Sequence, residues 1–215
     1  MGATAFQITS LLLGFIGLVF VIVSTLSTAW KMSTFHATLI TSTRTYDGLW
    51  RTCAFTSLGT MQCTFYWSLL ALNPYVQACR ALMIISIILG VLGTLMALFG
   101  LKCTNIGATD ETKKGKIALS GGLVYLFAGV CCLVPISWYA FNVAQDFYNP
   151  IYAGTRYELG SALYIGWAGA SLLILGGSFL CCSCKRNPKG YKYSAPKSGQ
   201  RIYTKSETSQ SKAYV

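Results

Sequence analysis

The sequence predicts an integral membrane protein of the α+β class, with four transmembrane helices and a β-hairpin outside the membrane. Three observations lead to this prediction: four long apolar runs, a polar stretch of alternating character between the first two runs, and an uneven distribution of basic residues. Of the 215 residues, 53% are hydrophobic and 11% are charged, whereas an average soluble domain has about 25% charged residues.

Four runs without a charged residue explain the low charge. Each exceeds the ~20 helical residues that cross a hydrocarbon core of roughly 30 Å, and an open sheet cannot satisfy its backbone in lipid. The first run could instead be a cleaved signal peptide, but it lacks a basic segment before it and is long for the apolar region of such a peptide. The third continues without charge to Gln145, so we expect it to project beyond the bilayer. The predicted spans are about 8–29, 81–101, 117–141 and 160–182.

The basic residues orient these spans. Four crossings place both termini and the 102–116 loop on one side, which carries twelve basic residues against five on the other. An excess of Lys and Arg marks the cytoplasmic side, so we expect both termini to be cytoplasmic. The formal net charge of +11 therefore reflects mainly topology and a tail near lipid. No nucleic-acid-binding motif accompanies it, and we expect no nucleic-acid partner.

This topology defines a four-span domain, 1–184, with outer loops at 30–80 and 142–158. A cytoplasmic tail, 185–215, is rich in Lys, Ser, Thr and Tyr and is expected to be disordered in isolation. In the fourth span, Ala162, Gly166 and Ala170 recur every four residues. This spacing lets helix backbones approach closely and favours one packed bundle, although Gly and Ala are also simply frequent in such spans.

The long outer loop contains a testable hairpin. Two runs are typical of strands, in which alternate residues share a face: Leu49, Arg51, Cys53 and Phe55 in one, and Met61, Cys63, Phe65 and Trp67 in the other. A turn signal at 57–59 separates them. If the turn is centred on Leu58, cross-strand partners have residue numbers that sum to 116, which sets Cys53 opposite Cys63.

Opposed residues lie ~4.5–5.5 Å apart between Cα atoms, a separation that a disulfide can span. The outer side of the membrane is also oxidising, so we expect a Cys53–Cys63 disulfide. Closing this loop stabilises the fold by roughly 3 kcal/mol in the chain-entropy model. A metal site is the alternative, but it needs more ligands, and the only histidine is His36.

Tryptophan and tyrosine residues near the outer ends of the spans have two interpretations. Trp30, Trp138 and Tyr139 are placed where aromatic residues line the membrane interface. The alternative for each is a role in the fold of the protein itself, not at the membrane interface. Trp50 follows Asp47-Gly48, a pair that predicts a tight turn. It either packs under the sheet or dips to the interface.

Together these residues resemble a known family signature. Trp30, the Gly48-Leu49-Trp50 triplet and the two cysteines resemble the claudin pattern W-(x)n-G-L-W-x2-C-x8–10-C. Further segments are similar to claudins over residues 1–182 and at the chain end. They are Gln77–Met83 with Arg80, Phe147–Pro150, Tyr157–Gly160 and the final Ala213-Tyr214-Val215.

The resemblance implies a left-handed four-helix transmembrane bundle topped by a small extracellular antiparallel β-sheet from both outer loops. It implies a tight-junction protein of the plasma membrane that polymerises in cis and trans, alone or with other claudins, into a paracellular barrier or charge-selective pore. No catalysis and no cofactor are expected.

The resemblance also implies contact residues. In cis, Ser68 and Leu69 of one copy would meet a pocket of the next copy lined by Phe147, Tyr148 and Leu159. Local packing under the sheet is the alternative for Leu69. The trans contacts expected between cells are Phe147, Tyr148 and Tyr157.

Ion selectivity is where this sequence departs from cation-pore claudins. The positions that resemble their acidic filter hold Thr56, Thr64 and Phe65. The first loop instead has a balance of +2, and a basic pore raises local anion concentration. We therefore expect a barrier or an anion preference. The candidate pore charges are Lys31, Arg44, Asp47 and Arg51. Two alternatives would reduce the charge that reaches the pore. Asp47 and Arg51 would neutralise each other if they face each other, or Lys31 would only extend its ammonium to the membrane edge.

On the inner side, cysteines beside the spans suit S-palmitoylation, with free thiols as the alternative. The candidates are Cys103, Cys181, Cys182 and Cys184, whereas Cys131 and Cys132 are expected to be core residues. The C-terminal Tyr214-Val215 offers an apolar residue and a carboxylate, which a PDZ groove binds by strand addition. The resemblance points to zonula occludens scaffolds as partners, besides membrane lipid.

The sequence also bears on two other classes of protein. An enzyme needs titratable groups that converge in a pocket, and one histidine with six carboxylates offers no such set. A four-span adhesion or channel-accessory protein of the wider claudin-like group shares the signature but is not expected to form strands. The second-loop Phe147–Pro150 segment and the Tyr-Val end favour a claudin.

Overall fold

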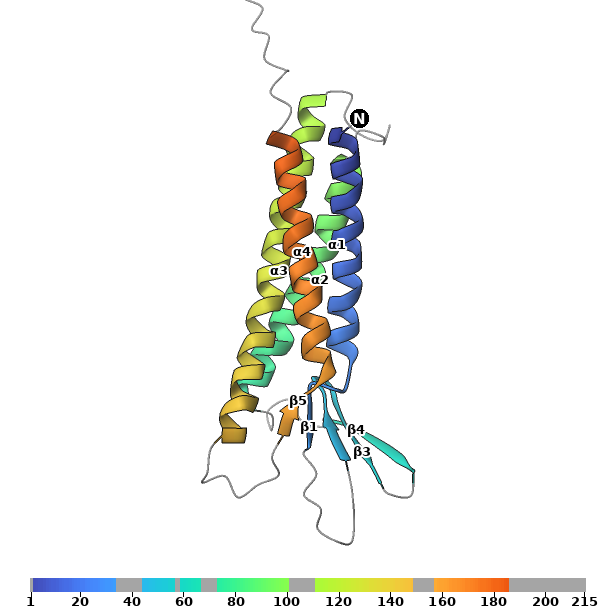
Figure 1. Ribbon diagram of the computed structural model, residues 1–215, viewed down its shortest axis with the longest axis vertical. Helices are drawn as coiled ribbons and strands as arrows, with labels where there is room; N and C mark the ends of the chain where they lie inside the picture. The colour runs from blue at the N-terminus through green and yellow to red at the C-terminus, as the bar shows by residue number, and fades with distance from the viewer. Residues whose placement is uncertain are drawn as a thin grey trace, which may run out of the picture.

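The structure is a computed structural model that describes residues 2–33, 44–56, 59–66, 73–100, 111–148 and 157–185. Within these residues it contains four long helices and a small sheet at the end of the bundle away from the start of the first helix (Figure 1). The helices are α1 (Gly2–Leu26), α2 (Pro74–Gly100), α3 (Glu111–Tyr148) and α4 (Ser161–Lys185). The strands are β1 (Lys31–Ser33), β2 (Arg44–Asp47), β3 (Arg51–Phe55), β4 (Met61–Phe65) and β5 (Tyr157–Leu159).

Each of the four helices contains a segment long and apolar enough to cross a membrane. The predicted α+β class, with a transmembrane bundle and an antiparallel sheet, is confirmed; the left-handed supercoil stays a prediction. The helix ends differ from the predicted spans. α1 ends earlier, at Leu26, while α2 begins at Pro74, a residue suited to the first turn of a helix. α3 extends past Gln145 to Tyr148, so the helix is longer than the predicted span, and its projection beyond the bilayer stays a prediction.

Small residues bring the helices of the bundle together. A Cβ added at Gly17 of α1 would lie 2.9 Å from the Gly169 carbonyl of α4, and the reverse contact is 3.0 Å. The predicted small-residue face of α4 also points inward, because Ala162 and Ala170 are fully buried. Close approach of this kind drives helix association in lipid, where apolar side chains gain little from leaving the tails. The spans therefore form one packed bundle.

The sheet draws on both outer loops. Its order is β4-β3-β2-β1-β5, and every neighbouring pair is antiparallel. The β3–β4 register confirms the predicted sum, since Cys53 pairs with Cys63 and Arg51 with Phe65. The turn places Gly59 at a φ of 78°, in the left-handed region that glycine adopts without steric cost.

Backbone hydrogen bonds fix the sheet to the bundle. The Gly160 amide donates to the Trp30 carbonyl at 2.9 Å, and the Ala162 amide donates to the Ala29 carbonyl at 3.0 Å. A side chain at Gly160 would collide with the Ala29 backbone, so this junction requires glycine. It sets β5 beside β1 at the entrance to α4.

Candidate functional site

The signature residues form the junction between sheet and bundle. Trp30 and Leu49 are fully buried, and the Trp30 indole N–H donates to the Ser24 carbonyl at 2.8 Å. The Trp30 ring meets Tyr139 edge-on, with 5.1 Å between ring centroids. Both residues therefore belong to the core rather than to the lipid interface. Trp138, by contrast, is 45% exposed, as an interface aromatic would be.

Arg80 of α2 binds the Gly48-Leu49-Trp50 segment on the side of the helix bundle. Its Nε donates to the Leu49 carbonyl at 2.6 Å, and its guanidinium carbon lies 5.0 Å from the Trp50 ring and 5.5 Å from the Tyr66 ring. Arg80 is only 6% exposed. Stacking between rings is a favourable environment for a desolvated guanidinium. Trp50 thus packs under the sheet, the first of its two interpretations.

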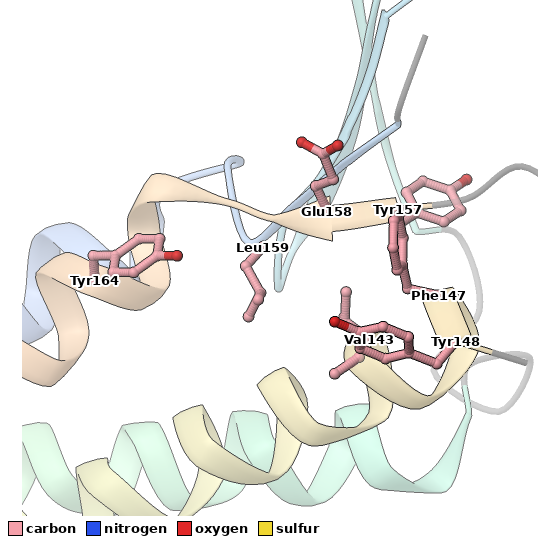
Figure 2. A pocket seen from close by; sticks show the side chains of 8 residues that line it. Val143, Phe147, Tyr148, Tyr157, Glu158, Leu159 and Tyr164 are labelled. Atoms are coloured by element: carbon pink, nitrogen blue, oxygen red, sulfur yellow. The ribbon is translucent and has the colours of Figure 1, made fainter. Parts of the chain in front are cut away.

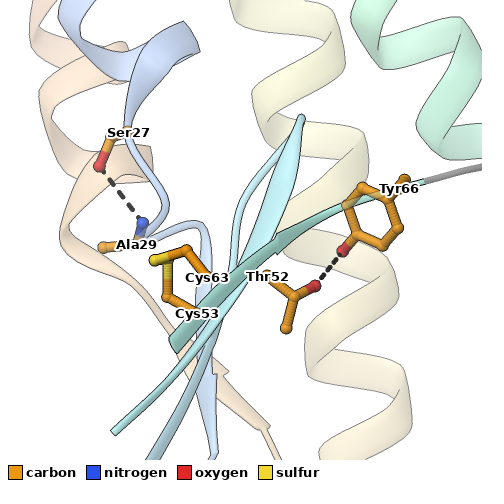
Figure 3. The surroundings of a disulfide bond; sticks show 6 residues. All are labelled: Ser27, Ala29, Thr52, Cys53, Cys63 and Tyr66. Carbon is orange, nitrogen blue, oxygen red and sulfur yellow. Dashed lines mark hydrogen bonds between the residues drawn. A yellow bond between two sulfur atoms is a disulfide. The ribbon is translucent and has the colours of Figure 1, made fainter. Parts of the chain in front are cut away.

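The disulfide joins β3 to β4. Cys53 and Cys63 are bonded, with 4.1 Å between their Cα atoms. Cys53 is buried while Cys63 is exposed. Next to Cys53 on β3, the Thr52 hydroxyl donates a hydrogen bond to the Tyr66 hydroxyl at 2.8 Å (Figure 3). Burial raises the pKa of Tyr66, so the phenol stays neutral. Sequence reasoning missed Tyr66, because its partners on β3 and α2 are distant in sequence.

One pair of the candidate pore charges neutralises itself. Lys31 pairs with Asp47 across β1 and β2, and its Nζ lies 3.4 Å from Asp47 Oδ2. The same Nζ lies 4.3 Å from the Tyr157 ring centroid. Burial alone would lower the pKa of Lys31, but the Asp47 carboxylate and nearby phenols raise it above its ordinary value. Asp47 therefore faces Lys31 rather than Arg51, and Lys31 is held within the sheet.

The other two candidates lie on the opposite face. Cross-strand pairing sets Arg44 opposite Phe55 and Arg51 opposite Phe65. Because side chains alternate along a strand, these four residues share a face from which Lys31 is excluded. Both arginines are exposed, as are the apolar residues between them, Phe55, Met61 and Phe65. Thr56 and Thr64, at the positions that resemble the cation filter, are exposed and uncharged.

A pocket of about 340 Å³ lies between the end of α3 and β5. Figure 2 shows Leu159 pointing from β5 toward α3, whereas Glu158 points away. Tyr148, next to Phe147 at the end of α3, is 81% exposed. The structure thus brings together the residues predicted for a cis acceptor and for trans contacts. The lining residues are Val143, Ala144, Phe147, Tyr148, Tyr157, Glu158, Leu159 and Tyr164.

Sequence reasoning missed the helical part of this pocket. The third span was predicted to cross the membrane to 141 and to project as far as Gln145, but Val143 and Ala144 on this projection were not predicted to line a pocket. The uncharged continuation to Gln145 was the signal that the helix goes on. The predicted donor residues Ser68 and Leu69 lie outside the described residues.

Comparison with known proteins decides the family. A family model described as the PMP-22/EMP/MP20/Claudin family matches residues 4–180. Claudin-15 of Bos taurus is 46% identical over 188 residues, covering 86% of this chain and 80% of the relative. Claudin-7 of Homo sapiens is 44% identical over 206 residues, covering 95% of this chain and 93% of the relative. The chain belongs to the claudin family.

Claudin-15 of Mus musculus is also similar, with 50% identity over 163 residues, 74% of this chain and 72% of the relative. The family predicted from the sequence is therefore confirmed, and with it a multi-pass membrane protein. The roles of single residues in this claudin rest on the geometry described above.

The end of α4 away from the sheet carries two of the predicted palmitoylation cysteines within the described side chains. Cys181 is half-buried and Cys182 is exposed near the end of α4. Cys103, the Cys184 side chain and the C-terminal Tyr214-Val215 lie outside the described parts. Cys132 is buried in the core and Cys131 partly so. Among the described residues, no group of His, Cys, Asp and Glu is arranged to hold a metal ion.

Proposed function

We propose that this chain is a strand-forming claudin of the tight junction. Copies would polymerise side by side in one membrane and meet copies on the neighbouring cell, which makes a paracellular barrier or ion pore. The observation that carries this proposal is the α3–β5 pocket, because it gathers residues from both ends of the second outer loop into one apolar recess. The claudin relatives support a junction role rather than an enzymatic one.

The pocket suits one apolar side chain from a neighbouring copy. Val143 and Leu159 supply aliphatic walls, and Phe147 and Tyr157 supply rings. Full burial of a leucine contributes about 1.5–3 kcal/mol, which is modest for one contact but repeats at every step of a polymer. Leu69, after Ser68, is the proposed donor. Tyr148, exposed at the tip of α3, is available for contacts in trans.

Two arginines support an anion preference or a barrier. Because Lys31 and Asp47 neutralise each other, Arg44 and Arg51 carry the positive charge of the first loop, and they share one exposed face of the sheet. Where two such faces line a narrow passage, the field attracts anions and repels cations. An acidic residue is absent from positions 56, 64 and 65.

The remaining proposals concern orientation and partners. The basic residues favour both termini in the cytoplasm, which leaves the disulfide-bonded sheet outside the cell. The C-terminal Val215 would bind PDZ scaffolds of the zonula occludens type. Palmitoylation at Cys181 and Cys182 would strengthen the hold of the inner helix end on lipid.

The test is expression in epithelial cells that lack tight-junction strands. Freeze-fracture imaging is expected to reveal strands, and dilution potentials across the layer are expected to favour Cl⁻ over Na⁺ or to report a raised resistance. Absence of strands at normal surface delivery would favour the alternative, an adhesion or channel-accessory protein. Strands with a strong Na⁺ preference would remove the charge proposal alone.

A further inference from the structure

β5 is a short edge strand that carries part of the pocket. Among the strands that the structure describes, it pairs with β1 alone, over three residues, and lies at the end of the sheet opposite β4. Cross-strand side-chain contacts stabilise a strand of this length, in addition to the backbone bonds at Gly160 and Ala162 that set it beside β1. Leu159 pairs with Lys31, and Tyr157 pairs with Ser33. The position of two pocket residues therefore depends on what Lys31 and Ser33 contact.

Lys31 connects β5 to the first outer loop. Its ammonium lies between Asp47 of β2, at 3.4 Å, and the ring of Tyr157 of β5, at 4.3 Å from the centroid. Alternation along the strands places all three side chains on one face of the sheet, and Leu159 shares that face. A single cation thus bridges the two outer loops through an ion pair on one side and a cation–π contact on the other.

The surroundings of this bridge favour a structural role over an ionic one. The Lys31 side chain is 25% exposed and that of Asp47 is 11% exposed. Both residues line a cavity of about 280 Å³ between the sheet and the outer ends of α2 and α3, where Tyr75 and Tyr139 also lie. A partly buried pair is screened by salt less than an exposed pair. Its net charge is zero, so it adds little to the field along an ion path.

We propose that Lys31, Asp47 and Tyr157 form a latch that holds β5 against β1 and thereby sets the shape of the α3–β5 pocket. The two charged residues act on assembly through the pocket and do not select ions. The role of the pocket as an acceptor belongs to the function proposed above, so the effect on assembly rests on that function. The effect on β5 itself does not.

Hydrogen–deuterium exchange of the purified full chain in detergent tests the latch in a single copy. Lys31→Met and Asp47→Asn are expected to accelerate amide exchange at 157–159, up to roughly fivefold for loss of an ion pair. Tyr157→Leu is expected to do the same, while Tyr157→Phe, which keeps the ring, and Lys31→Arg, which keeps the charge, are expected to match wild type. Unchanged exchange in the first three variants overturns the latch.

The same variants are then expressed in cells without strands. Surface delivery and an intact Cys53–Cys63 bond on a non-reducing gel select the folded variants. Lys31→Met, Asp47→Asn and Tyr157→Leu are expected to shorten strands and lower energy transfer between labelled copies, with Na⁺ to Cl⁻ selectivity unchanged in the strands that remain. Tyr157→Phe is the matched control.

Two outcomes separate the proposals. If Asp47→Asn favours Cl⁻ and Lys31→Met favours Na⁺ while assembly is normal, the residues are pore charges and the latch is wrong. If the wild-type chain forms no strands, the proposed function fails, and the exchange measurement still decides whether the latch exists.

Discussion

The two faces of the outer sheet differ in whether their charged side chains are neutralised. On one face, Lys31 and Asp47 neutralise each other over a cavity next to the bundle. On the other, Arg44 and Arg51 are exposed among apolar side chains. A count of charges along the loop weights these residues equally. Strand register separates them into a pair that stabilises the sheet and a pair that faces the outside.

The largest effect is expected from removing the disulfide, because it crosslinks β3 to β4, the hairpin that carries Arg51 and its exposed apolar neighbours. The double variant Cys53→Ser, Cys63→Ser should lower the free energy of unfolding by roughly 3 kcal/mol in the chain-entropy model. Chemical denaturation of the purified protein measures this change. Cys182→Ser, an exposed thiol at the inner end, is the control. Equal midpoints for all three proteins would mean that the hairpin holds without its crosslink.

Arg80 provides a contrast with the two exposed arginines. Arg80→Met should cost roughly 2 kcal/mol, since it removes a charge-assisted hydrogen bond to the Leu49 carbonyl. Arg80→Lys should recover only part of the loss, because an ammonium lacks the flat guanidinium that stacks on Trp50. Thermal unfolding followed by tryptophan fluorescence reports both. Stability equal to wild type in Arg80→Met would assign this arginine a role other than fastening the loop.

A smaller effect is expected at the pocket on the neutral face. Leu159→Ala should weaken association between copies by about 1–2 kcal/mol, since it removes apolar groups from the recess. Energy transfer between labelled copies at matched surface density measures the loss. Met32→Ala, on the opposite face of β1, serves as the comparison. A greater loss for Met32→Ala would place the contact between copies on the arginine face.

The smallest effect on stability, but the clearest on function, is expected at Arg51. Arg51→Glu should change the free energy of unfolding by no more than about 0.5 kcal/mol, as exposed substitutions generally do. Its dilution potential should shift toward Na⁺, while Arg51→Lys should keep the wild-type value. An unchanged potential in Arg51→Glu would remove this face from the ion path.

The sequence was most informative where a constraint is local. The turn signal at 57–59 predicts the β3–β4 register, and with it the Cys53–Cys63 pair, from neighbouring residues alone. The ends of the helices are harder to predict from the sequence. Hydropathy locates the apolar segment that crosses the membrane, whereas the helix itself can continue beyond that segment. α3 is an example, because it extends to Tyr148, beyond its predicted span.

The contacts that were not predicted join segments far apart in the chain. Pairing of Lys31 with Asp47 depends on the β1–β2 register, for which the sequence offers no turn centre comparable to Leu58. The approach of Tyr157 to Lys31 depends further on β5 crossing to β1 from the second outer loop. Resemblance identified Arg80 as notable, but its bond to the Leu49 carbonyl follows only from the packing of α2 under the sheet.

The junction at Gly160 has a mechanical consequence. The backbone bonds from Gly160 to Trp30 and from Ala162 to Ala29 join the segment between α1 and β1 to the segment where β5 leads into α4. A pull on the sheet from an opposing cell would therefore be shared between two membrane helices. Each helix resists extraction through its own apolar surface in lipid. In the assembly proposed above, tension between cells would therefore reach the membrane through two helices and not through a single hinge.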